Sequence, residues 1–481
     1  MSEQQKYYIT TPIYYVNDKP HVGTVYTTIS ADVLARRHRQ KGDEVFFLVG
    51  VDENSQKNVE SAKKAGKDVQ VYVDELAGIF RETWLKLGIS FDRFIRTTSA
   101  EHKKAVYDFF KRVNDKGDIY QGDYEGYYCV GCEEFKVESD LVEGKCPEHK
   151  REPEWISEKN YFFKLSNYRQ ALLDHIDSNP DFIQPVSRRN EMVNYIRDHM
   201  EDFSITRQTA EWGIPLPTDE SQVIYVWFDA LINYLSGIGF GQDQEKFEKY
   251  WPADLQLMGK NITKFHCAYW TGMLLSAGLP LPKKIYAHGF FTINGEKISK
   301  SLGNAIDPLD LIEEYPFDAV RYFMLREIKY GEDGDFSLDR LRERYNSDLA
   351  NDLGNLVQRT LNMIDKYLGG KVNKSVRHDA PVDFVQVSNL TEELRFDEAL
   401  KVIWLGVSWA NKYIEDEKPW EIAKVGDLEK LAIVLARLYD ILKDIAYELV
   451  AYLPETAEKI KDLLEVDEVV PPVGSLFPRK E

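Results

Sequence analysis

The run Val45-Phe-Phe-Leu-Val-Gly-Val-Asp-Glu53 decides the fold of this 481-residue chain. Its first five residues are continuously apolar, as expected of a parallel strand that is covered on both faces. Upstream, Tyr7 to Thr11 reads as a buried strand, and from Val25 the apolar residues repeat with a helical period until Gly42. Strand, helix and strand in this order form a βαβ unit, so the sequence predicts a parallel, doubly wound sheet.

Polar residues stand at the ends of both expected strands. Ligands of doubly wound sheets bind at the carboxyl ends of strands, where His21 and Asp52 both fall. His21 also precedes the N-terminus of the expected helix, where backbone amides and the helix dipole favour phosphate. A helix-capping or loop histidine is the alternative, and the local sequence does not decide between the two.

The alternation of strand and helix resumes far along the chain. Val223 to Trp227 and Leu255 to Met258 read as strands, Lys264 to Leu275 as a helix, and Lys284 to Ala287 as a further strand. One doubly wound domain is therefore expected, split by the sequence that lies between its two halves.

The stretch Tyr286–Asn304 continues from the last of these strands into a lysine loop. Gly295 and Gly303 flank Lys297 and Lys300 and let the backbone bend sharply. Two ammonium groups on a loop at the end of a strand suit a polyphosphate whose charge grows during reaction. A solvated loop of lysine and serine is the alternative for so short a match.

The segment between the two halves carries a cysteine and histidine motif. Cys129-Val-Gly-Cys132 and Cys146-Pro-Glu-His149 give a C-x2-C…C-x2-H pattern on two tight turns. Three thiolates and an imidazole complete a tetrahedral zinc shell without an open position, so the metal is expected to be structural. Unrelated free cysteines and a surface histidine are the alternative. The remaining cysteine, Cys267, lies in an apolar helix and is expected in the core.

From about residue 339 the apolar pattern is helical throughout, which predicts a helical bundle. The expected fold class is α/β, a split Rossmann-type doubly wound parallel sheet with a zinc-knuckle insert, followed by an all-α helical bundle. Trp420 follows Pro419 in an expected loop, where the indole can either stack on a base or cover the bundle core. The expected parts are residues 1–116 and 223–338 for the two halves of the sheet domain, 117–222 for the insert and 339–481 for the bundle.

Composition limits the class of function. Four cysteines exclude a disulfide scaffold, and no apolar run of transmembrane length or N-terminal signal pattern is present, so a cytoplasmic protein is expected. The net charge of −19 argues against nucleic-acid binding by the whole surface. A local basic face can still exist on an acidic protein.

Together these motifs resemble the class I aminoacyl-tRNA synthetases, specifically the methionyl-tRNA synthetases of the single zinc-knuckle bacterial type. The resemblance covers essentially all of residues 6–478. Lys297-Ile-Ser-Lys-Ser301 looks like the KMSKS signature of the family, with Ile298 in place of methionine, and His21-Val-Gly-Thr24 looks like its HIGH signature. Each motif alone is modest, and their order and spacing together are highly specific.

The resemblance implies a set of site residues. The catalytic groups would be His21, Thr24, Lys297 and Lys300. ATP would be bound by His21, Gly23, Thr24, Gly259, Asn261, Lys297, Ser299 and Lys300. Methionine would be held by Ile13, Tyr15, Asp52, Trp227, Ala230, Leu231, Tyr234 and His288. The anticodon would be read by Asn355, Arg359 and Trp420.

The implied reaction has two steps, for which the protein supplies positioning and charge stabilisation. The methionine carboxylate attacks ATP-Mg²⁺ to give methionyl-adenylate and pyrophosphate. The terminal ribose of tRNA(Met), including the initiator tRNA, then takes the methionyl group. One structural Zn²⁺ per chain is implied as cofactor. A monomer is expected, because the chain stops near the end of the bundle and lacks the further C-terminal domain of some relatives.

Three departures from the family pattern leave the rate of activation open. Thr24 stands for the second signature histidine, Asp52-Glu-Asn-Ser55 for Asp-Glu-His-Gly, and Asn261 for an aspartate near the ATP ribose. Three other functions also stay open. A synthetase for leucine, valine or isoleucine shares the fold but usually carries a longer insert. A non-catalytic tRNA-binding descendant would lack ATP–pyrophosphate exchange, and a nucleotidyltransferase that activates a small acid would not charge tRNA.

Overall fold

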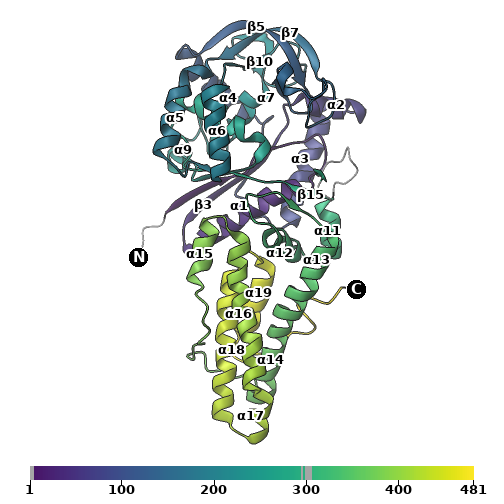
Figure 1. Cartoon of the computed structure of the whole chain (residues 1–481), viewed down its shortest axis with the longest axis vertical. Coiled ribbons are helices and arrows are strands. Elements are labelled where there is room, and N and C mark those ends of the chain that lie inside the picture. Colours follow the sequence, from purple (N-terminus) through teal and green to yellow (C-terminus); the bar gives the residue numbers. More distant parts are fainter. Residues whose placement is uncertain (1–4, 294–295, 298–305, 481) are drawn as a thin grey trace. The chain divides into compact units, whose positions relative to one another are not determined.

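The computed structural model describes residues 5–293, 296–297 and 306–480. The chain divides into two compact units (Figure 1). The first comprises Met1–Ala31 and Gly42–His288, and the second comprises Asp32–Lys41 and Gly289–Glu481. Helix α1 (Val22–Lys41) contributes to both units. The finer division into four parts stays a prediction.

A parallel sheet forms the centre of the first unit. Its main path runs β2-β3-β1-β13-β14-β8, and β4 pairs with the other side of β3. Strand β1 pairs in parallel with β13, so the two halves of the sequence meet in the middle of the sheet, with Ile9 opposite Leu255. The split doubly wound sheet is therefore confirmed. Its strands are β1 (Lys6–Thr10), β2 (Tyr14–Tyr15), β3 (Glu44–Asp52), β4 (Arg93–Arg96), β8 (Ile183–Gln184), β13 (Leu255–Gly259) and β14 (Ile285–His288).

Strand β3 confirms the interpretation of the apolar run in the sequence. Phe47, Leu48 and Val49 are fully buried, because helices cover both faces of the sheet. Helix α3 (Val69–Lys86) begins after Asp68, and α4 (Ala100–Asp115) begins after Ser99; both side chains accept hydrogen bonds from first-turn amides. The remaining helices near this sheet are α2 (Gln56–Lys64), α9 (Gln244–Tyr250) and α10 (Thr271–Ser276).

The insert forms a second, antiparallel sheet of order β6-β5-β7-β9. The long strands β5 and β7 pair over most of their length (Figure 1), and the cysteine motif begins at the last residue of β5. The short strand β8 leaves the insert and extends the parallel sheet, which two residues could not signal in the sequence. The insert elements are β5 (Ile119–Cys129), β6 (Glu134–Lys136), β7 (Glu154–Phe163), α5 (Arg169–Ser178), α6 (Val186–Asp198) and β9 (Phe203–Ser204).

The strand expected at Val223 to Trp227 is wrong in its extent and in its sheet. Strand β12 (Asp219–Ile224) lies in a small antiparallel sheet with β10 (Thr206–Arg207) and β11 (Pro215–Leu216), outside the parallel sheet. Helix α7 (Val226–Ala230) follows at once and is buried on all sides. An apolar helix without a polar face has the same sequence pattern as a buried strand, so periodicity cannot separate them.

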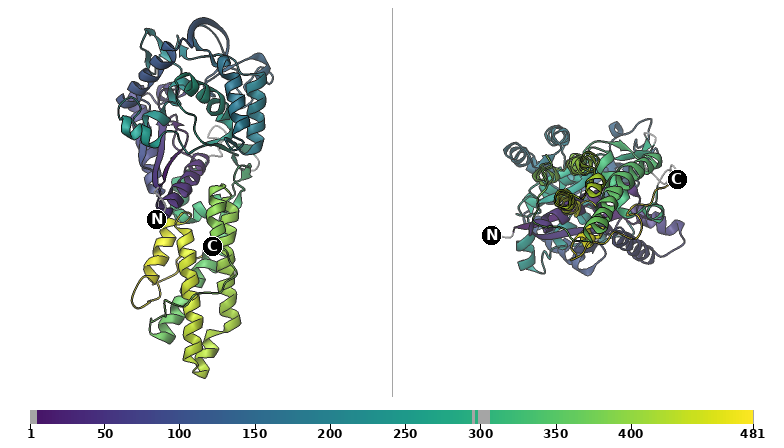
Figure 2. Two further views of the ribbon diagram at one scale, coloured as in Figure 1. Left: turned by 90° about the vertical axis from the view of Figure 1, so that its left-hand side faces the viewer. Right: turned by 90° about the horizontal axis from the view of Figure 1, so that it is seen from below.

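The second unit is mainly helical, which confirms the bundle. Helices α14, α16 and α18 pack on one another and run side by side in both views (Figures 1 and 2). A small sheet joins β15 (Phe291–Ile293) to β16 (Glu296–Lys297) and β17 (Gly334–Asp335). The helices are α11 (Pro308–Glu314), α12 (Phe317–Glu327), α13 (Leu338–Arg344), a π-helical segment (Tyr345–Gly354), α14 (Asn355–Leu368), α15 (Val385–Glu392), α16 (Phe396–Glu417), α17 (Pro419–Val425), α18 (Leu428–Leu449) and α19 (Pro454–Leu464).

A buried guanidinium ties three parts of this unit together. Arg321 of α12 is fully buried and pairs with Asp32 of α1 at 2.7 Å. It also donates to the carbonyls of Tyr452 and Ala451, at 2.7 and 3.0 Å. Because one planar group satisfies three acceptors from distant segments, it fixes their mutual register. Among the described helices, none is long and apolar enough to cross a membrane.

Candidate active site and cysteine cluster

The HIGH-like residues cap the N-terminus of α1. The ring Nδ1 of His21 accepts a hydrogen bond from the Gly23 amide at 3.1 Å. The Thr24 hydroxyl donates to the His21 carbonyl at 2.7 Å and accepts from the His21 amide at 3.1 Å. This reciprocal arrangement holds the first turn of α1 in place. The structure therefore shows the capping role of His21 and Thr24, and their phosphate-binding role stays a prediction.

Asp52 is the last residue of β3 and presents a buried carboxylate. The side chain is 2% exposed, accepts from the Asn54 amide at 3.2 Å, and forms no ion pair within the described part of the chain. Burial raises the pKa of Asp52 well above its ordinary value, and the neighbouring Asp229 adds to the rise. A buried carboxylate without a charged partner would be stabilised by a cationic ligand group.

Apolar and aromatic side chains lie in one cluster near this carboxylate. Trp227 of α7 stacks on Phe265, with ring centroids 3.7 Å apart and planes at 2°. The Tyr15 hydroxyl and the Trp227 indole nitrogen are buried and have no hydrogen-bond partner among the described residues. Both groups can therefore form a hydrogen bond to a ligand or to water. The members of this cluster that were predicted from the sequence are Ile13, Tyr15, Trp227, Leu231 and Tyr234; Ala230 is buried beside them on α7.

The histidine beside Tyr234 is His266, which the sequence analysis did not select. His266 Nδ1 lies 3.0 Å from the Ile262 carbonyl and must donate there, so its Nε2 accepts from the Tyr234 hydroxyl at 2.7 Å. Burial lowers the pKa of His266 to about 4, which keeps the ring neutral. The predicted His288 lies instead at the end of β14, where its Nε2 contacts the Thr27 hydroxyl at 2.7 Å.

Asn54 occupies the position of one departure from the family pattern. Its side-chain amide donates to Asp229 at 2.7 Å and to the Thr97 carbonyl at 3.3 Å. Asp229 also bonds to His102 at 2.6 Å, and both of these side chains are fully buried. Asn54 thus satisfies a buried carboxylate on α7 from the segment that follows Asp52, and the departure is accommodated by a complete network.

The predicted ATP residues are only partly within the described chain. Gly259 ends β13 and Asn261 follows in a short 3-10 turn, both at the carboxyl edge of the parallel sheet. The backbone of Lys297 belongs to β16. Ser299 and Lys300 lie outside the described residues.

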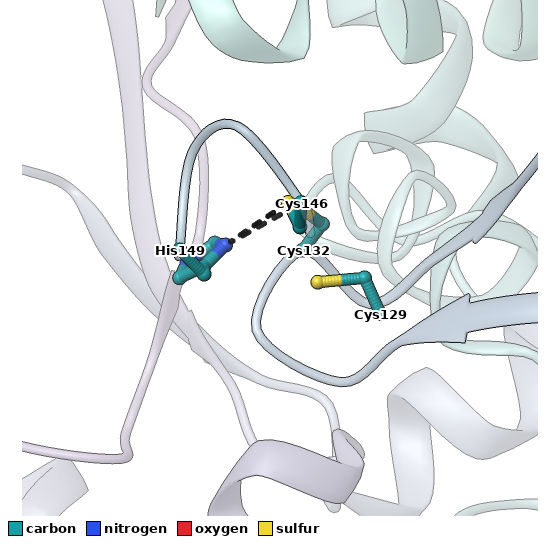
Figure 3. A group of neighbouring side chains, drawn as sticks. All are labelled: Cys129, Cys132, Cys146 and His149. Atoms are coloured by element: carbon teal, nitrogen blue, oxygen red, sulfur yellow. Dashed lines mark hydrogen bonds between the residues drawn. The ribbon is translucent and has the colours of Figure 1, made fainter. Parts of the chain in front are cut away.

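The cysteine motif brings its four side chains together (Figure 3). The ligand atoms of Cys129, Cys132, Cys146 and His149 all lie within 4.8 Å of one another. The Cys132 sulfur is 3.5 Å from that of Cys146 and 3.3 Å from His149 Nδ1. Zinc–sulfur bonds of about 2.3 Å place tetrahedral ligands roughly 3.8 Å apart, so the set can hold such an ion.

Gly131 shows that the knuckle is shaped around its histidine. A Cβ atom at this position would lie 2.6 Å from the His149 ring, closer than any side chain tolerates. The tight C-x2-C turn therefore needs glycine for space, although the sequence indicated only a turn.

Comparisons with known proteins assign the family. The description "tRNA synthetases class I (M)" matches residues 7–153 and 149–361. Methionine–tRNA ligase of Thermotoga maritima is 48% identical over 95% of this chain and 74% of its own length, and that of Streptomyces coelicolor is 43% identical over 98% and 91%. The structure of Mycobacterium tuberculosis methionyl-tRNA synthetase in complex with methionyl-adenylate has a TM-score of 0.93 at 40% identity, covering 99% of this chain and 100% of that chain.

The chain belongs to the methionyl-tRNA synthetases of class I. The resemblance seen in the sequence is thereby confirmed, and so is the fold that it implied. The individual site residues stay predictions, because family membership alone does not test them.

The residues predicted to read the anticodon of the tRNA lie at two places in the bundle. Asn355 is exposed at the first residue of α14, and Arg359 lies one turn later with an ion pair to Glu415 at 2.6 Å. Trp420 is half-buried in the first turn of α17, so the expected loop is wrong. The helix forms because Pro419 suits a first helical position, after Lys418 breaks α16 with φ of +47°.

Proposed function

We propose that this chain attaches methionine to tRNA(Met), including the initiator tRNA, by way of methionyl-adenylate. Membership of the methionine–tRNA ligase family supports the reaction. The observation that carries the choice of amino acid is the buried Asp52 carboxylate next to an aromatic cluster with two orphaned polar groups. An ammonium group and an apolar side chain are the two features that such a site accepts.

Asp52 pairs with the α-ammonium of methionine in this proposal. Trp227 and Tyr15 surround the thioether, and a polarisable sulfur gains roughly 0.3–1.5 kcal/mol from each aromatic contact. Leu231, Ile13 and Ala230 complete the apolar wall. Phe265 joins this set because it stacks on Trp227, and His266 joins it because it accepts a hydrogen bond from Tyr234. His288, at the end of β14, contacts Thr27 of α1 and stays in the proposed set.

In this proposal, ATP-Mg²⁺ binds at the N-terminus of α1 and at the lysine loop. His21, Gly23 and Thr24 present a helix N-terminus to its phosphates. Gly259 and Asn261 lie at the sheet edge where a ribose would bind. Lys297 and Lys300 would neutralise the leaving pyrophosphate, and the Ser299 hydroxyl would donate a hydrogen bond to it. These groups position the reactants and stabilise charge, and none forms a covalent bond to substrate.

The cysteine cluster is proposed to bind one structural Zn²⁺. Cys129, Cys132, Cys146 and His149 would fill the tetrahedral shell, which leaves no position for a reactive water. Zinc would stabilise the fold of the knuckle, and it would supply no chemistry to the reaction. We also propose a monomer that acts in the cytoplasm.

The deciding experiment is a two-assay comparison across amino acids. ATP–pyrophosphate exchange and charging of tRNA(Met) are measured with methionine, leucine, valine, isoleucine and cysteine. Exchange and charging with methionine alone support the proposal. Exchange without charging would favour a small-acid nucleotidyltransferase, and the absence of both would favour a non-catalytic tRNA-binding protein.

A further inference from the structure

Glu133 is a buried carboxylate within the cysteine knuckle, directly after Cys132. It is 1% exposed and adopts a left-handed backbone with φ of +53°. A side chain other than glycine rarely takes this conformation unless its surroundings demand it. The contacts of Glu133 show what holds it there.

The side chain of Glu133 binds the N-terminus of α2. Its Oε1 accepts from the Lys57 amide at 2.7 Å, and its Oε2 accepts from the Tyr128 hydroxyl at 2.5 Å. A carboxylate at a helix N-terminus satisfies an orphan amide and complements the helix dipole. The Lys57 ammonium returns a hydrogen bond to the Gly131 carbonyl at 3.0 Å.

Helix α2 in turn holds the end of β3. The Asn58 amide group donates to the Asp52 carbonyl at 2.9 Å, one residue beyond the Lys57 amide that Glu133 caps. The Lys57 ammonium also lies 5.5 Å from the centre of the Tyr15 ring. Glu133 is therefore two contacts away from both Asp52 and Tyr15.

The backbone of Glu133 reaches the opposite side of the same cluster. Its carbonyl accepts from the Tyr225 hydroxyl at 2.5 Å. Tyr225 immediately precedes α7, which carries Trp227. One residue of the knuckle thus contacts the segment after Asp52 with its side chain and the segment before Trp227 with its carbonyl.

We propose that Glu133 is a positioning residue for methionine, which sets the distance between the carboxylate of Asp52 and the indole of Trp227. The inference rests on the methionine site proposed above. This proposal gives the cysteine knuckle a role in the first unit beyond holding its own fold. The knuckle orders Glu133, and Glu133 orders both sides of the amino-acid site.

The test compares three substitutions in the full chain. Glu133→Ala removes both side-chain acceptors and is expected to weaken methionine binding about tenfold or more, because the Lys57 amide and the Tyr128 hydroxyl then lose their acceptor. Glu133→Gln keeps an acceptor for the Lys57 amide and should recover most of that binding. Tyr225→Phe removes only the contact to the carbonyl and should weaken methionine binding severalfold. Methionine binding is measured by calorimetry, and exchange kinetics give KM for methionine and for ATP.

The matched control is Glu138→Gln, an exposed residue in the 3-10 turn that follows β6. Zinc content and melting temperature are recorded for every variant. The proposal is supported if KM for methionine rises while KM for ATP and zinc content match the unsubstituted protein. Unchanged methionine affinity in both Glu133→Ala and Tyr225→Phe would overturn it, as would an equal rise of both KM values. Should the unsubstituted protein itself bind no methionine, the proposed function would fail first.

Discussion

Asp52 is the residue on which substrate recognition and stability make opposite demands. Burial and the charge of Asp229 raise its pKa, so the ionised form is disfavoured in the folded protein without ligand. A carboxyl group whose pKa is raised on folding lowers stability at pH values above its unfolded pKa. This penalty is complete above the folded pKa, shrinks as pH falls through that value, and is gone below the unfolded pKa. An ammonium ligand supplies the missing partner.

We expect Asp52→Asn to raise the melting temperature of the unliganded protein by about 2 °C or more at pH 8, where the penalty is present. The gain should shrink on acidification, because the unsubstituted side chain becomes neutral. The same change should lower kcat/KM for methionine about a hundredfold or more, since a buried charge loses its partner. In the unsubstituted protein, methionine affinity should fall with decreasing pH, starting above the range of an ordinary aspartate. Scanning fluorimetry between pH 5 and 8 measures the melting temperatures, and calorimetry over the same range measures methionine affinity. A lower melting temperature for Asp52→Asn would contradict the stability prediction.

The residues of the amino-acid site were partly predictable. Asp52 follows an apolar run, and such strand ends are where ligands bind in these sheets. His266 was missed because it lies inside an apolar helix, where a histidine is indistinguishable from a core residue until its contact with Tyr234 is known. Glu133 was missed for a related reason, since its role depends on three hydrogen bonds to distant segments.

Among the elements, the knuckle depends most directly on a bound ion. We expect one Zn²⁺ per chain, and Cys146→Ser should release most of it, because the tetrahedral shell then loses a thiolate. Loss of zinc should expose the loop around Lys145 and Lys150 to trypsin, since the metal stabilises the local fold. Mass spectrometry of the metal and of the tryptic peptides measures both effects. Cys267→Ser, at a buried cysteine outside the motif, is the control, and unchanged zinc in Cys146→Ser would refute the ligand assignment.

The lysine loop is the element for which we propose a purely electrostatic role. Lys297→Ala or Lys300→Ala should slow adenylate formation about a hundredfold or more, because each charge acts mainly on the transition state. Methionine binding should change little. Single-turnover kinetics and calorimetry separate the two quantities, with the exposed Lys283→Ala as a control on a neighbouring segment. Equal losses in rate and binding would argue against this role.

Helices and strands with a long apolar or periodic pattern were predicted correctly from the sequence. Strand β3 was predicted from the continuous apolar run at residues 45–49, and the bundle from the helical period after about residue 339. The failures are short or fully buried elements. Strand β8 has two residues, α7 has no polar face, and α17 begins with proline directly after another helix. In each case tertiary burial, which a local pattern does not contain, determines the structure.

At the scale of the whole molecule, the acidic surface bears on how the chain meets tRNA. The chain carries a net charge of −19, and three arginines of the second unit form ion pairs: Arg340 and Arg344 pair with Glu327, and Arg359 pairs with Glu415. If the bundle recognises RNA, as we propose, we expect it to rely on stacking and base edges more than on a basic field.

Trp420 is the residue best suited to such stacking. Base–aromatic stacking is worth roughly 1–3 kcal/mol per base, so Trp420→Ala should lower kcat/KM for tRNA charging about tenfold to a hundredfold. ATP–pyrophosphate exchange without tRNA should change little, because the bundle holds none of the residues assigned to methionine or ATP. Trp404→Ala is the contrasting variant, since this indole is 7% exposed and packs against Tyr322 at 4.4 Å. It should lower the melting temperature and depress both activities together. If Trp420→Ala behaves as Trp404→Ala is expected to, Trp420 serves the bundle core and the anticodon role is wrong.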